Sequence, residues 1–166
     1  MSTVDKAIAE KSDLKTLDLA TEHLFDMVVH LEQPMEVGNI PKGNRQILIG
    51  KGGEFNGKRL RGEILPHGAD WYLTRPDGVG ELDVRVTLRT DDGALIYMQS
   101  DGFLRYSMDV AKRLLSGVAE PHEYYLREKT SFETAAEKYG WLNSIVAVGT
   151  GWYGNAMVGM SIYEIK

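Results

Sequence analysis

The clearest arrangement for chemistry is the alternation of charged and apolar residues in segment 81–89. Its polar side chains recur at every second position and include Asp83, Arg85, Thr87 and Arg89. A period of two places them on one face of a β-strand and Leu82, Val84, Val86 and Leu88 on the other. Opposite charges two residues apart can pair, and inside a pocket such a pair could hold a polar ligand.

Periodicity by itself favours a solvated polar face, with the apolar stripe in the core. The alternative turns Asp83 and Arg85 inward, and the apolar stripe is then covered by a helix, the N-terminal arm or a second subunit. A second polar stripe, formed by Arg59, Arg61 and Glu63, could meet the first across a sheet. Charges inside a protein are costly unless they are paired, so a pocket would use paired ones.

Other motifs do not support a cofactor or a metal. The glycines of segment 149–154 match a dinucleotide-binding pattern, but segment 157–163 reads as a strand where that site needs a helix. We therefore expect a glycine-rich hairpin there and no nucleotide. The four histidines, at positions 23, 30, 67 and 122, lack the spacing of metal ligands. No Gly-x-Ser-x-Gly motif supports a serine nucleophile.

Composition narrows the class of protein further. The chain has 166 residues, a net charge of −5 and no cysteine, which disfavours nucleic-acid binding and excludes disulfides and thiolate chemistry. No window is apolar enough for a membrane span or a signal peptide, so a cytoplasmic location is expected. The length suits one domain, which we place at residues 17–166 after an N-terminal extension at 1–16.

Short strands separated by turn residues dominate that domain. Asn56-Gly57, Pro76-Asp77-Gly78 and Asp91-Asp92-Gly93 carry the residues that tight turns require. One helix is predicted over 108–116, with Ser107 before it and Gly117 after it. The pattern predicts an all-β fold, a single antiparallel β-barrel of about 8–10 strands, because closure removes exposed strand edges.

The sequence also resembles a known family. The wording of segments 59–71, 75–78, 81–97, 123–125, 132–134 and 139–143 is similar to that of the domain-of-unknown-function family 3237 (DUF 3237), over about residues 23–165. The resemblance implies a compact antiparallel β-barrel and no settled reaction. It matches charged positions such as Asp83 and Arg85, which favours placing them in the lumen. Val86 and segment 99–101 depart from the family pattern, so no substrate is carried over.

We therefore expect a barrel that binds a small molecule, with no metal or cofactor, and that catalyses non-redox proton transfer on an aromatic or enone-like ligand. Asp70 or Asp83 would be the base, with a pKa raised by burial, and Tyr97 or Tyr124 the proton donor. Arg61 and Arg85 would hold a carboxylate or enolate, and Trp71, Trp141 and Asn143 would line the ligand site. The alternatives are a non-catalytic, lipocalin-like binding protein and an accessory subunit with a packed lumen. Self-association is expected if the apolar stripe faces outward.

Overall fold

The computed structural model describes residues 2–3, 5–6 and 18–166. The predicted extension at 1–16 therefore lies almost entirely outside the described residues. The strands are β1 (Thr21–Leu31), β2 (Met35–Ile40), β3 (Gly43–Asn56), β4 (Arg61–Ile64), β5 (Ala69–Asp70), β6 (Leu73–Thr74), β7 (Gly80–Thr90), β8 (Leu95–Arg105), β9 (Tyr125–Glu133), β10 (Ala147–Gly154) and β11 (Met157–Ile165).

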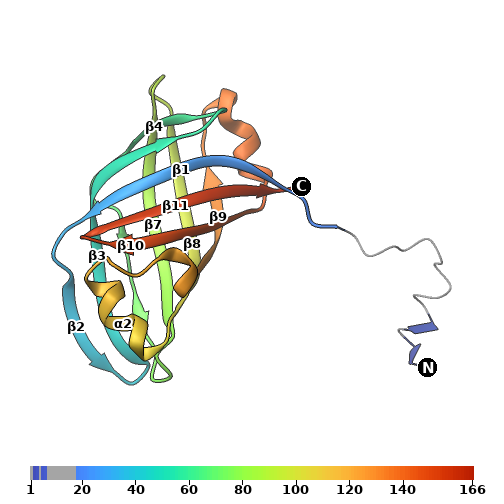
Figure 1. Ribbon diagram of the computed structural model, residues 1–166. Coiled ribbons are helices and arrows are strands. Elements are labelled where there is room, and N and C mark those ends of the chain that lie inside the picture. The colour runs from blue at the N-terminus through green and yellow to red at the C-terminus, as the bar shows by residue number, and fades with distance from the viewer. Residues whose placement is uncertain (1, 4, 7–17) are drawn as a thin grey trace.

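These strands form one antiparallel sheet that closes into an eight-stranded barrel (Figure 1). The order around the barrel is β1, β11, β10, β9, β8, β7, β4 and β3, and pairing of β1 with β3 completes the circle. The short strands β5 and β6 continue the wall between β3 and β7, while β2 forms a hairpin on β3. The predicted all-β barrel is thus confirmed.

Strand periodicity decides which side chains enter the lumen. On β7, Val86 and Leu88 are buried, and Leu82 and Val84 pack against the core, whereas Arg89 is exposed. On β9, burial alternates without a fault from Tyr125 to Glu133. The reading that periodicity favoured, with the apolar stripe inside, is the one the structure adopts.

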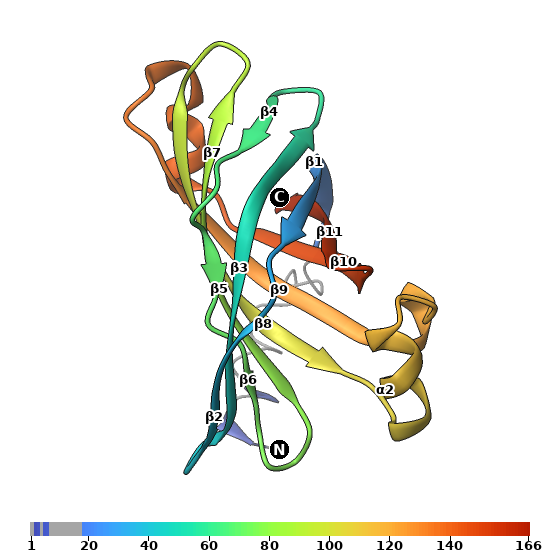
Figure 2. The ribbon, with the colours of Figure 1, turned by 90° about the vertical axis from the view of Figure 1, so that its left-hand side faces the viewer.

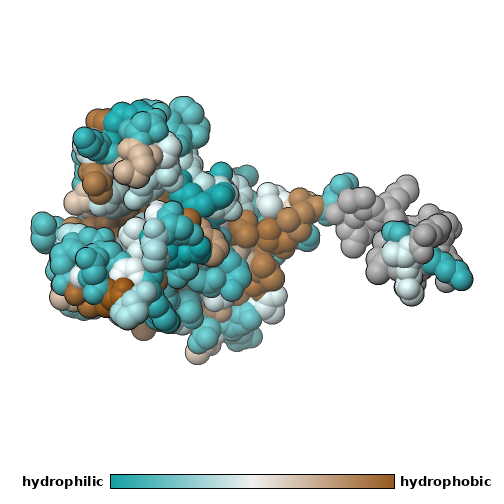
Figure 3. Space-filling view, turned by 90° about the horizontal axis from the view of Figure 1, so that it is seen from below, coloured by the Kyte–Doolittle hydropathy of each residue, from teal (hydrophilic) through white to brown (hydrophobic). Residues whose placement is uncertain are grey.

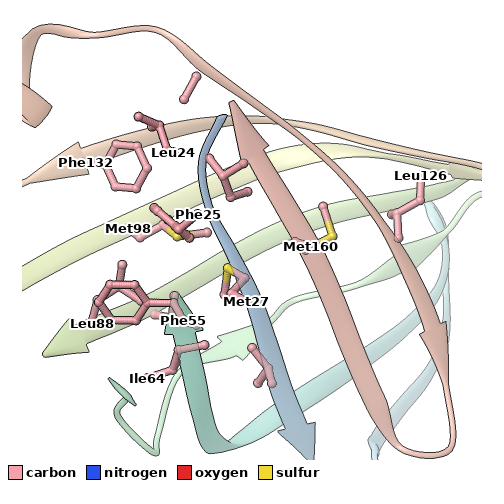
Figure 4. Close-up of a cluster of buried hydrophobic side chains, with 14 of the residues drawn as sticks. Leu24, Phe25, Met27, Phe55, Ile64, Leu88, Met98, Leu126, Phe132 and Met160 are labelled. Atoms are coloured by element: carbon pink, nitrogen blue, oxygen red, sulfur yellow. The ribbon is translucent and has the colours of Figure 1, made fainter. Parts of the chain in front are cut away.

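One end of the barrel is filled by side chains. Phe25 meets both Phe55 and Phe132 edge-on, with ring centroids 5.4 Å and 6.1 Å apart, and Leu88 packs in the same cluster (Figure 4). Edge-to-face contacts of this kind add to the stabilisation from burying the rings. The short helix η2 (Glu137–Ser144) lies at this end and buries Tyr139 and Leu142.

The opposite end carries the predicted helix, α2 (Met108–Leu115), followed by the short helix η1 (Pro121–Glu123). Val110 and Leu114 are buried, and Gly117 takes the left-handed conformation (φ 72°) expected after a helix. Ser107 precedes the helix but makes no capping bond with its side chain. Figure 2 shows α2 and β2 on opposite sides of this end. The sequence had predicted one helix, and η1 and η2 are additions to it.

The glycines of 149–154 belong to β10, which turns directly into β11. Asn155 and Ala156 form the turn with φ of 53° and 56°, the pattern of a type I′ hairpin. The expected glycine-rich hairpin is confirmed.

The packed end gives a first testable prediction. Leu88→Ala should lower the free energy of unfolding by about 2–5 kcal/mol, because its side chain is fully buried against the aromatic cluster. The matched variant Leu95→Ala should change it by less than about 0.5 kcal/mol, because Leu95 is exposed. Urea denaturation measures both, and equal losses would contradict the assigned core.

Candidate active site in the barrel lumen

Between the packed end and α2 the lumen is hollow. An inner cavity of about 70 Å³ adjoins an outer cavity of about 190 Å³, and Leu48, Asp70, Leu82 and Val158 line both. Apolar side chains form most of the walls, and Leu114 and Leu115 of α2 border the outer cavity. Seen from below, the surface shows hydrophobic residues among hydrophilic ones (Figure 3). A mostly apolar cavity with a few polar groups is typical of small-molecule sites.

Asp70 is placed where the two cavities meet. It lies on β5 opposite Leu48 of β3 and Val84 of β7, and directly opposed residues share a face, so its side chain points into the lumen. The backbone N–H of Asp83 donates a hydrogen bond of 2.9 Å to its Oδ1. Burial nevertheless raises the pKa of Asp70 to about 7, with a further contribution from the charge of Asp83.

Glu128 is a second carboxyl in the lumen, and it lines the inner cavity. Its side chain is buried, and burial raises its pKa to about 7 against the opposing effect of the Ser100 hydroxyl. Thr130 Oγ1 lies 3.4 Å from Glu128 Oε1 and 2.9 Å from Ser100 Oγ. These hydroxyls, both fully buried, hold the carboxyl within the wall of the barrel.

Glycines on both neighbouring strands make room for Glu128. In the ladder it faces Gly102 of β8 and Gly149 of β10. A Cβ at Gly149 would lie 2.7 Å from Glu128 Cγ, and one at Gly102 would lie 2.6 Å from Glu128 Cα. Both distances are shorter than real contacts allow, so an alanine at either position would displace the acid or the strand that carries it.

The two carboxyls influence each other, since the charge of Asp70 raises the pKa of Glu128. The positive charge of Arg45 opposes the rise at Asp70. Glu128 is the more deeply buried of the two, whereas Asp70 receives a backbone donor and the influence of Arg45. This difference favours Asp70 as the group that ionises first and Glu128 as the group that keeps its proton.

Tyrosines and polar side chains border the outer cavity. Tyr72, Tyr106 and Tyr153 contribute to its lining, together with Gln46 and Thr74. Burial raises the pKa of Tyr72, so its hydroxyl is protonated at neutral pH. Tyr124 lines neither cavity, but its hydroxyl accepts a hydrogen bond of 3.2 Å from the backbone N–H of Tyr153.

Asp83 and Arg85 do not point into the lumen, contrary to the expectation drawn from the family resemblance. They form an ion pair of 2.8 Å on the outer face, with 45% and 39% of their side chains exposed. Leu82, Val84 and Val86 occupy the inner face of β7 instead. Apolar side chains are stabilised by facing the lumen and not by facing solvent. The inner face of β7 is therefore the one that its periodicity predicts, and not the one that the resemblance implied. The expected self-association rested on an outward apolar stripe, and this stripe lies inside.

The expected cluster of Arg61, Asp83 and Arg85 does not form. Arg61 pairs at 3.1 Å with Asp91, next to the β7–β8 turn, and its side chain is 68% exposed. Trp71 lies on the outer face, with the Arg85 guanidinium 5.2 Å from its ring centroid. Tyr97 faces outward as well, opposite Thr87, and its hydroxyl contacts Gln99 at 3.4 Å.

Trp141 and Asn143 lie in η2, at the packed end. The Arg59 guanidinium stacks 3.4 Å from the Trp141 ring centroid. Asn143 receives a hydrogen bond of 2.8 Å from the backbone N–H of Thr134 and donates one of 2.9 Å to its carbonyl. Both residues fasten η2 to the barrel and line neither cavity.

Of the predicted site residues, the structure brings only Asp70 into the lumen. Sequence reasoning missed Glu128, Ser100 and the tyrosines of the outer cavity. A signal for Glu128 was present, because it shares a period-two face with Leu126 and Phe132. Because Arg127 and Lys129 flank Glu128, the sequence there shows three successive charged residues, which are typical of a solvent-exposed segment.

In the described ranges, no three His, Cys, Asp or Glu side chains gather closely enough to hold a metal ion. None of the described helices combines the length and the apolar character needed to cross a bilayer.

The fold and the lumen define a class of protein, the closed antiparallel β-barrel with an acidic cavity. Residues 19–165 match the family described as "protein of unknown function (DUF3237)", and the chain belongs to this family. The resemblance found in the sequence is confirmed.

Similar proteins from several bacteria carry the name UPF0311 protein. One from Rhodopseudomonas palustris is 32% identical over 136 residues, which cover 81% of this chain and 89% of the relative. One from Clostridium acetobutylicum is 33% identical over 129 residues, covering 76% and 82%.

Solved structures agree on the fold. A β-barrel-like protein from Acinetobacter baumannii is 36% identical with a TM-score of 0.81, covering 93% of this chain and all of that one. An enzyme from Penicillium herquei shares the fold at 20% identity, with a TM-score of 0.71, over 92% of this chain and 98% of that one.

The raised pKa values predict how stability depends on pH. Asp70 and Glu128 bind protons more tightly when folded than when unfolded, so the free energy of unfolding should fall as pH rises from about 5 to 8. The loss should be on the order of 2 kcal/mol per group. Urea denaturation across this range should show the decline in the parent and not in the double variant Asp70→Asn/Glu128→Gln.

The outward pair Asp91→Asn/Glu133→Gln is the matched control for this experiment, because the charges of these exposed residues do not act on Asp70 or Glu128. It carries the same chemical changes on the solvent side and should keep the decline. Parallel pH profiles for the parent and the lumen double variant would contradict the buried, raised-pKa carboxyls.

The surface position of Arg85 gives a further prediction. Arg85→Ala should lower the free energy of unfolding by only about 1 kcal/mol, because it removes a solvent-screened ion pair and an exposed contact with Trp71. A loss of about 3–5 kcal/mol would instead indicate a buried pair whose remaining partner is left uncompensated. Chemical denaturation at neutral pH separates the two outcomes.

Proposed function

We propose that this protein binds a small ring compound in its lumen and catalyses a non-redox proton transfer on it, such as an isomerisation, dehydration or cyclisation. The observation that carries the proposal is the pair of carboxyls, Asp70 and Glu128, on one apolar cavity. Each has a pKa of about 7, and general acid–base catalysis is most efficient when the pKa lies near the working pH.

The proposed roles follow from the surroundings of each acid. As a carboxylate, Asp70 takes a proton from a carbon next to a carbonyl group. The C–H electron pair becomes the new C=C bond, and Glu128 gives its proton to the carbonyl oxygen to form the enol. Where a further C=C bond is conjugated with the enol, Asp70 delivers its proton to the far carbon and the enol O–H proton returns to Glu128, which restores the carbonyl group and both acids and completes an isomerisation. No electron acceptor is required at any step.

The same cavity bears on the two alternative functions, an accessory subunit and a lipocalin-like carrier. An accessory barrel with a packed lumen would not need the two adjoining hollows. A lipocalin-like carrier would suit the apolar walls, but it would gain nothing from two buried carboxyls, which are costly to keep in an apolar lumen. Uncharged side chains of the same shape as the two acids, with their hydrogen bonds satisfied, could line the cavity of a carrier at a lower cost in folding stability.

Proton exchange on 2-tetralone tests the proposal. This neutral ketone has acidic C–H bonds beside its carbonyl, and deuterium uptake from D₂O is followed by NMR. The parent should exchange it about 100-fold faster than Asp70→Asn or the double variant Asp70→Asn/Glu128→Gln, as expected for loss of a positioned base. The rate should rise with pH as Asp70 ionises and fall again as Glu128 loses its proton, which gives a bell-shaped profile with its maximum near pH 7.

Two variants on the outer face serve as controls. Asp91→Asn and Glu133→Gln carry the same chemical changes away from the lumen and should exchange the ketone at the parent rate. An equal rate in the parent and in the lumen double variant, with both folded by circular dichroism, would contradict the proposal.

A further inference from the structure

The lumen has a single sign of charge. In the part of the chain that the structure describes, the residues lining the two cavities include Asp70 and Glu128 but no lysine, arginine or histidine. The basic side chains of β7 and β9 face outward, where several form ion pairs. The sequence had led us to expect arginines holding an anionic ligand, and the lumen lacks them.

Charged residues that lie outside the two cavities do not change the negative character of the lumen. Asp70 feels the carboxylate of Asp83 and, in opposition, the guanidinium of Arg45, which donates to the Trp71 carbonyl oxygen. Glu128 feels Asp70 and, from β8, Asp101. A carboxylate ligand in the lumen would therefore lose its hydration and meet two acids with no cation beside it, and such burial of an unpaired charge is strongly unfavourable.

The polar groups of the outer cavity suit an uncharged ligand. Tyr72, Tyr106 and Tyr153 line this cavity, and a tyrosine hydroxyl can donate to or accept from a carbonyl or hydroxyl group. The outer cavity, at about 190 Å³, is smaller than the ~300–1,000 Å³ of sites for drug-sized ligands. Its size points to a compound of one or two rings.

We propose that the lumen selects its ligand by charge, accepting a neutral one- or two-ring compound with a hydroxyl or carbonyl group and rejecting the carboxylate of the same shape. This inference rests on the proposed function, because it names the substrate class of the same site. It differs from a general preference for apolar compounds, since the two acids themselves cause the rejection.

Matched probes test the inference. At about pH 8, where both acids are ionised, 2-naphthol is neutral and 2-naphthoate is an anion of similar shape. Titration calorimetry on the parent should give a Kd for 2-naphthoate at least ~30-fold higher than for 2-naphthol. In the double variant Asp70→Asn/Glu128→Gln the ratio should fall by at least about threefold, because the repulsion by the two acids is removed while the anion still loses its hydration.

The control variant Asp91→Asn/Glu133→Gln, at two exposed positions whose charges do not act on the lumen acids, should keep the discrimination of the parent. The inference is overturned if 2-naphthoate binds the parent as tightly as 2-naphthol, if neither probe binds, or if the double variant discriminates as the parent does. The 2-tetralone experiment distinguishes these failures from failure of the proposed function. Base-dependent exchange without charge discrimination would overturn the ligand class alone, and absence of both would overturn the two together.

Discussion

Two carboxyl groups, the buried Glu128 and the half-buried Asp70, line an apolar lumen whose lining has no basic side chain among the described residues, and they set the demands on the rest of the barrel. Because closure pairs the strands with one another, the lining side chains decide the polarity of the lumen. Asp70 and Glu128 therefore dominate its electrostatics. Their cost in stability must be offset by apolar burial elsewhere, and the aromatic cluster at the packed end supplies it.

The wall of the barrel is adapted to hold these acids. Glu128 sits between two glycines, and the buried hydroxyls of Ser100 and Thr130 contact each other beside it. Asp70 is carried by a strand of only two residues, held on one side by β3 and on the other by β7. A short strand clamped on both edges fixes one side chain accurately without adding bulk to the lumen, which is what a site on a rigid scaffold requires.

Local sequence patterns were sufficient to predict the barrel, the helix at 108–116 and the hairpin after Gly149, because period, turn residues and capping residues act over short distances. The functional hypothesis from the sequence named Asp70 or Asp83 as a base with a pKa raised by burial, and the structure places Asp70 on the lumen. The error at Asp83 and Arg85 arose because residues that carry a family resemblance can be surface pairs, and these two are. Glu128 and the tyrosines were missed because only the closed topology brings β3, β5, β8 and β9 around one cavity.

A barrel packed at one end forms a pocket that is closed at that end, and not a channel. The Phe25, Phe55 and Phe132 cluster fills one end, and Asp70 lines both cavities, so a molecule that moves between the inner and the outer cavity passes Asp70 in either direction. A reactant and its product would then share one path, and slow release of the product would delay binding of the next reactant. Only the end of a long polymer could enter a pocket that is closed at one end.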